Sequence, residues 1–84
     1  MRTLVTVSPE DHRRLMHRVG KDSLLHDLLE TGVLIKRSSM GVEKMVVYMT
    51  CDHEQLQSLL QVAQRLRPKV TLKIDQLPQV SQGH

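Results

Sequence analysis

The pattern of apolar and polar positions divides the chain into a series of strands and helices. Residues 2–7, RTLVTV, are rich in β-branched types and predict a strand. Ser8 is a good N-cap residue and Pro9 suits the first position of a helix. We therefore expect a strand that leads directly into a helix.

The connection that follows this strand contains more than one helix. The apolar residues of 15–19 and those of 24–29 fall roughly 160–200° apart when each residue advances by about 100°. One straight helix cannot bury both sets. We therefore predict a break or sharp bend at Gly20–Lys21–Asp22, with Asp22 or Ser23 capping a second helix that closes at Gly32.

A β-hairpin is predicted next, from residues 33–37 and 42–51 with a polar turn, SSMG, at 38–41. Its second strand carries apolar residues on both faces, as a central strand does. One face would hold Met45, Val47 and Met49, and the other Val46 and Tyr48.

The last third of the chain predicts a helix and a strand. Asp52 precedes an amphipathic helix that runs from His53 to about Arg67, where Pro68 ends it. Residues 69–75, KVTLKID, alternate as in a half-buried edge strand.

The resulting order, β-α-β-β-α-β, predicts an α+β fold of the ferredoxin-like type. This is a two-layer sandwich in which both crossovers lie on one face of an antiparallel sheet, here with the first crossover helix broken near Gly20. Strands one and three occupy the middle of such a sheet. We expect residues 1–75 to form a single domain and residues 76–84 a flexible tail.

A winged-helix arrangement is the alternative that the break at Gly20 allows. Residues 10–19 and 23–31 would form a helix-turn-helix, and residues 33–51 would be its wing. The second of these helices, SLLHDLLE, carries four leucines and two acidic residues where a groove-reading helix needs exposed Arg, Asn or Gln. This composition disfavours the alternative.

Composition narrows the possible functions. Tyr48 is the sole aromatic residue, so the core must be aliphatic. The chain also lacks the aromatic residues on which an RNA recognition motif stacks bases. The formal net charge of +3 is compatible with nucleic acid without requiring it. A single cysteine rules out an internal disulfide, and no signal peptide or membrane span is evident. We expect a soluble cytoplasmic protein of bacterial style.

A basic cluster, DHRRLMHRVG at residues 11–20, is the most conspicuous charged feature. Its bases share the side of a helix opposite the apolar residues, which is the ordinary pattern of a solvated face. The functional hypothesis is a phosphate-binding patch that reads no sequence. Its candidate residues are Arg13, Arg14, His17, Arg18, Lys21, Lys36 and Arg37, to which Lys44 could add.

The doubly apolar third strand suggests a different function. If helices cover one face of the sheet, the simplest cover for the other apolar face is a second copy of the chain or another protein. The alternative is that the C-terminal tail or the bent first crossover covers this face internally. The candidate interface residues are Met45, Val46, Val47, Tyr48 and Met49, and the pattern leaves open which of the two sets faces outward. The favoured hypothesis is thus a small regulatory or adaptor module that forms a homodimer or binds a protein partner. Nucleic-acid binding through the basic cluster is the alternative.

Catalysis is not expected. Cys51-Asp52-His53 supplies at most two metal ligands, and the other histidines show no spacing that completes a tetrahedral site. No zinc-protease helix or phosphate-binding glycine loop is present. We therefore assign no catalytic residue, metal or cofactor, and interpret Cys51 as a core residue and His12 as a partly buried structural histidine.

Overall fold

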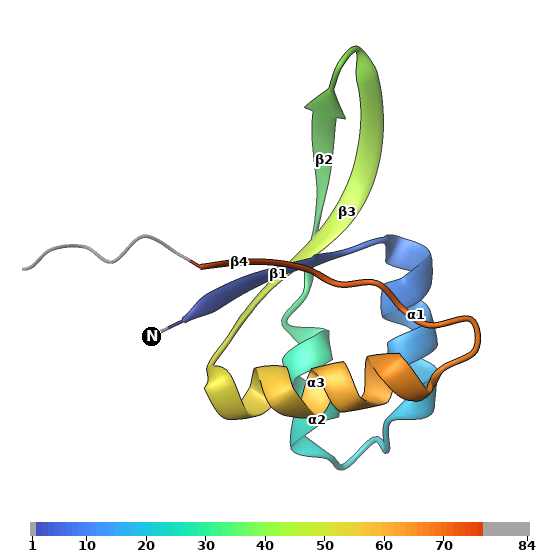
Figure 1. Cartoon of the computed structure of the whole chain (residues 1–84), viewed down its shortest axis with the longest axis vertical. Coiled ribbons are helices and arrows are strands. Elements are labelled where there is room, and N and C mark those ends of the chain that lie inside the picture. The colour runs from blue at the N-terminus through green and yellow to red at the C-terminus, as the bar shows by residue number, and fades with distance from the viewer. Residues whose placement is uncertain (1, 77–84) are drawn as a thin grey trace, which may run out of the picture.

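Four strands form one antiparallel sheet in the order β2-β3-β1-β4. The computed structural model describes residues 2–76 of the chain (Figure 1). The strands are β1 (Thr3–Val7), β2 (Val33–Ser39), β3 (Val42–Cys51) and β4 (Lys73–Gln76). The helices are α1 (Pro9–Arg18), α2 (Leu24–Glu30) and α3 (His53–Arg65). The predicted α+β class is confirmed, and β1 and β3 lie in the middle of the sheet. The predicted tail lies outside the described residues, except for Gln76, which ends β4.

Side-chain caps fix where the helices begin. The Ser8 hydroxyl accepts a hydrogen bond from the Asp11 amide at 3.1 Å, and the Ser23 hydroxyl accepts one from the His26 amide at 3.1 Å. Asp52 and Gln55 form a reciprocal capping box at the start of α3. The predicted break at Gly20 is therefore confirmed, with Ser23 as the cap of the second helix.

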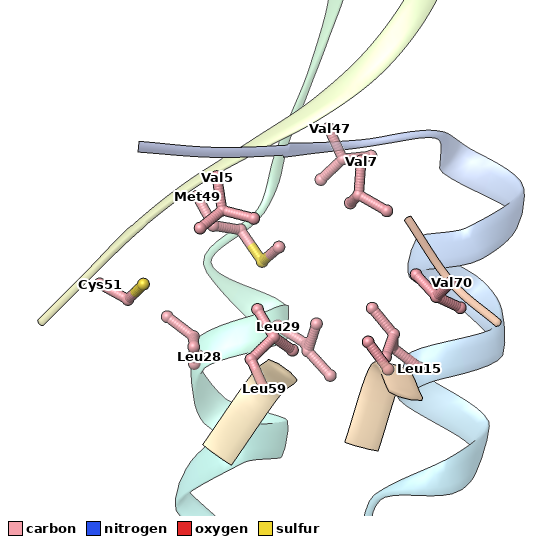
Figure 2. Close-up of a cluster of buried hydrophobic side chains, with 11 residues drawn as sticks. Val5, Val7, Leu15, Leu28, Leu29, Val47, Met49, Cys51, Leu59 and Val70 are labelled. Atoms are coloured by element: carbon pink, nitrogen blue, oxygen red, sulfur yellow. The ribbon is translucent and has the colours of Figure 1, made fainter. Parts of the chain in front are cut away.

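The core lies between the helices and one side of the central strands. The register pairs Val5 with Met49 and Val7 with Val47, so these four side chains point to the same side of the sheet. Leucines from all three helices meet them there (Figure 2). The helical residues of this core are Leu15, Leu28, Leu29, Leu59 and Ala63, and Val70 joins them from the segment after α3.

The last strand is shorter than predicted. Residues 69–72 do not join the sheet, because the Val70 amide donates its hydrogen bond to the Ala63 carbonyl oxygen at 3.2 Å. Val70 therefore packs into the core beside α3. Only Lys73–Gln76 pairs with β1.

The β2–β3 hairpin extends well beyond the helices. β1 pairs with β3 only as far as Val47, so within the described part of the chain the rest of β3 pairs with β2 alone. We call residues 35–46 the arm; it projects from the body of the molecule (Figure 1). The predicted turn at 38–41 is also tighter, because β2 runs to Ser39 and only Met40 and Gly41 connect the strands. Both have positive φ, at 52° and 78°, as in a type I′ turn.

Gly32 holds the junction between α2 and β2, and its lack of a side chain is required there. A Cβ atom at this position would lie 2.6 Å from Val47 Cγ1 and 3.1 Å from the Leu29 carbonyl oxygen. Gly32→Ala should therefore lower the free energy of unfolding by about 1–3 kcal/mol. Urea unfolding curves measure this change.

Gly20→Ala is the matched control, because a Cβ atom at Gly20 would meet nothing within 4 Å. Gly20→Ala should leave stability unchanged or raise it by up to about 1 kcal/mol. Equal destabilisation by the two substitutions would contradict the close approach of α2, β2 and β3 at Gly32.

Candidate functional site

Among residues 2–76, no segment covers the side of the sheet opposite the helices. The helices contact the side that holds Val5, Val47 and Met49, so the alternate residues of each strand face the other way. The register places these outward residues in rows across the strands. One row is Val33–Tyr48–Thr6–Lys73, and its neighbours are Ile35–Val46 on one side and Thr50–Leu4–Asp75 on the other. We call this surface the open face.

Only some of the interface residues suggested by the sequence lie on the open face. Val46 and Tyr48 lie on it and are partly buried. Val47 and Met49 belong to the internal core, where they are almost fully buried. Met45 points to the side of the helices but lies in the arm, beyond them, and is exposed. The structure therefore places Val46 and Tyr48 on the outward side of β3 and buries the side chains of Val47 and Met49 in the core.

An apolar depression occupies the half of the open face near the starts of β1 and β2 and the end of β3. Its volume is about 330 Å³. Its walls come from three strands and the turn before β2: Leu4, Thr31, Val33, Ile35, Tyr48, Met49 and Thr50. None of the described residues that line it is charged, so this half of the face is suited to apolar contacts.

A groove on the arm side of the open face has the opposite character. Arg37, Lys44 and Lys73 line it together with Thr6, Ser39, Met40, Val42 and Val46. No carboxylate is among the described residues that line it. Arg37 and Lys44 are direct cross-strand partners, and like charges in such positions repel each other. The groove therefore offers a binding site for an anion.

The basic patch suggested by the sequence is divided among three places. Arg14 is held within the protein: its guanidinium lies 3.1 Å from Asp11 Oδ1 and also donates to the Pro68 carbonyl oxygen. It therefore joins α1 to the segment after α3. Lys36 Nζ lies 3.4 Å from Glu43 Oε2 on the helix-facing side of the arm, whereas Arg37 lies on the open side. The remaining members of the patch, Arg13, His17, Arg18 and Lys21, are exposed on or just after α1.

His12 and Cys51, the two side chains considered for catalysis or metal binding, have structural roles. His12 Nε2 lies 2.7 Å from the Leu29 carbonyl oxygen, to which it donates a hydrogen bond across α1 and α2. Cys51 is fully buried, and this burial raises the pKa of its thiol. The Asp52 carboxylate raises the pKa further, while Arg2 opposes the shift. Because the thiolate is the nucleophile, the site disfavours nucleophilic use of Cys51.

One cluster of titratable side chains on α2 was not predicted from the sequence. His26, Asp27 and Glu30 bring their potential ligand atoms within 4.8 Å of one another on α2. The His–Glu spacing of four residues along a helix was the signal that could have revealed it. His26 Nδ1 is buried and lies 3.5 Å from Glu30 Oε1, too far for a good hydrogen bond. Both acids are exposed, so the cluster is also compatible with an ordinary surface pair.

Comparisons of the chain with protein-family models, with curated proteins and with solved structures found no match. Among residues 2–76, no helix has the length and apolar character needed to cross a membrane. The open face and the arm are therefore the features that can point to a function.

The buried thiol gives a pH-dependent prediction. Because the pKa of Cys51 is raised in the folded state, its contribution to stability is present below the ordinary thiol value of 9.0 and is lost as pH rises above it. In that window the free energy of unfolding should fall by up to about 1.4 kcal/mol per pH unit from this group. Urea unfolding curves recorded from neutral pH to above pH 9.0 measure the slope.

Cys51→Ala is the comparison that isolates the thiol from other groups that titrate at high pH. The variant should start less stable, because a buried side chain is shortened, and should lose less stability as pH rises. Parallel losses in both proteins would contradict the burial of a protonated thiol.

Proposed function

We propose that the protein is a small, non-catalytic binding module whose open face is covered by a second copy of the chain. The observation that carries this proposal is the run of apolar residues across three strands on a side that none of the three helices covers. They are Leu4, Val33, Ile35, Val46 and Tyr48. Uncovered apolar surfaces of this kind mark interaction sites in small proteins.

We infer that the architecture is a ferredoxin-like sandwich with its first crossover divided into two helices. The order β2-β3-β1-β4, with the first and third strands central, supports this interpretation. The alternative winged-helix function gains no support from α2, whose exposed residues include Leu24, Asp27 and Glu30. These side chains would not read the edges of base pairs.

A second copy is the preferred occupant because the apolar surface continues to the edge of the sheet. β2 is an edge strand that begins with the apolar run Val33-Leu34-Ile35. Proteins usually protect or cover such an edge. The same patch on a second copy is self-complementary about a two-fold axis, which is the commonest way in which small proteins associate.

The absence of a catalytic role is proposed from the placement of the reactive side chains. Cys51 is buried with a raised thiol pKa, and His12 uses its Nε2 atom to join two helices. We also propose, from the sequence, that this module acts in the cytoplasm.

Val33→Lys tests the proposed dimer. Val33 lies on the apolar half of the open face and is 57% exposed, so its substitution should leave the monomer folded. Burying an unpaired charge in the interface should weaken association at least about tenfold. Light scattering at two protein concentrations should show a dimer for the natural chain, insensitive to salt, and a shift to monomer for the variant.

Leu24→Lys is the matched control, because Leu24 is a still more exposed apolar residue, at 82%, and lies on α2. It should dimerise like the natural chain. A natural chain that stays monomeric at both concentrations, or equal effects of the two substitutions, would overturn the proposal.

A further inference from the structure

The arm is a two-stranded ribbon that gains little stability from contacts with the body of the protein. Every residue from Lys36 to Met45 is exposed, and beyond Val47 the ribbon is held only by the pairing of β2 with β3. A two-stranded hairpin by itself is at best marginally stable in water. A projection of this kind is most readily explained by a contact that the arm makes outside the chain.

The charges on the arm indicate an anionic partner. Its acidic residue, Glu43, lies 3.4 Å from Lys36 on the helix-facing side. On the other side Arg37 directly faces Lys44, and Lys73 of β4 lines the same groove. None of these three cations has a carboxylate within ion-pair distance among residues 2–76. The resulting repulsion would be relieved by phosphate groups.

The tip of the arm has a residue that the turn itself does not favour. Met40 has a φ of 52° and its side chain is 99% exposed. Type I′ turns prefer Asn, Asp or Gly at this position, and an exposed methionine gains nothing from water. The conformation and exposure of Met40 are therefore better explained by a contact with apolar surface on a partner.

We propose that the arm binds duplex DNA by entering one of its grooves. Two-stranded ribbons of DNA-binding proteins enter the major or the minor groove, and methionine is among the side chains that DNA-bending proteins wedge between base steps from the minor groove. Arg37, Lys44 and Lys73 contact phosphates, while Met40 meets the base steps at the tip. This activity goes beyond the proposed dimerisation and does not require it, although a dimer would carry two arms.

A duplex is favoured over a single strand by the side chains available for contact. Single-strand binders stack successive bases on aromatic residues, and the chain has one, Tyr48, which lies in the body of the sheet rather than in the arm. Cations beside an apolar tip match instead the phosphates and base steps of a bent duplex.

The first test measures binding of the full chain to a fluorescently labelled 20-base-pair duplex by anisotropy. Three phosphate contacts predict a slope of about −2.7 in log affinity against log salt for one arm, or about a 40-fold loss between 50 and 200 mM salt. Lys44→Glu should weaken binding at least about tenfold. It should also raise the melting temperature by about 2–5 °C, because the introduced carboxylate faces Arg37.

Lys21→Glu makes the same change in net charge in the turn between α1 and α2 and should leave the affinity within about threefold. An equal loss in both variants would overturn the arm as the binding element. It would indicate general charge attraction or the exposed bases near α1 instead.

The second test separates the tip from the phosphate contacts. Met40→Asn should stabilise the turn and keep the salt dependence, but reduce the DNA bend measured by energy transfer between dyes at the two duplex ends. A substitution that raises the melting temperature while it reduces DNA deformation cannot act by unfolding the arm. An unchanged bend would overturn the role of Met40.

Competition identifies the class of partner. Unlabelled duplex should displace the labelled duplex, whereas the same mass of single-stranded DNA or of vesicles rich in phosphatidylserine should compete at least about tenfold less well. Preferential binding to either competitor, or no binding to the duplex at 50 mM salt and 100 µM protein, would overturn the proposal.

Discussion

The antiparallel pairing of β1 with the second half of β3 is the contact on which the rest of the structure depends. It places Val5 and Val7 beside Met49 and Val47, and this surface receives leucines from all three helices. Because the chain has no Phe or Trp, many small aliphatic contacts must provide the stability that a few aromatic residues supply elsewhere. β1 is only five residues long, so the packed part of the sheet is short as well.

This short pairing gives the molecule its two candidate binding surfaces. β3 has ten residues, and those that β1 does not reach pair with β2 alone. The half of β3 that pairs with β1 has an open side of apolar character, and the half that pairs with β2 alone forms the cationic arm. Apolar contact between copies and electrostatic contact with DNA can therefore use adjacent parts of the same two strands, with Ile35 and Val46 at their boundary.

Local signals in the sequence predicted the order of the elements. Ser8, Gly20 and Asp52 act through capping or through the direction of helical faces, which depend on nearby residues alone. The boundaries that failed depend on contacts between distant residues. Val70 looked like part of a strand, but its amide bonds to Ala63, and no local pattern encodes that bond.

The candidate site was less predictable for the same reason. Alternation in β3 correctly separated Val46 and Tyr48 from Val47 and Met49, but it could not say which set the helices cover. The two-residue turn at Met40–Gly41 sets the register that brings Arg37 opposite Lys44, whereas the wider predicted turn gives no such pair. Arg14 looked like a member of an exposed patch, but it contacts Pro68, which is 54 residues away in the chain.

Tyr48 offers a direct test of the central claim that the open face is covered by a second copy. As the sole aromatic residue, it reports on that face without any label. The measurement is the quenching of its fluorescence by acrylamide as protein concentration rises through the range of association. The account predicts that quenching becomes weaker as dimer forms. Quenching that stays constant while light scattering shows a dimer would place the interface elsewhere and contradict the account.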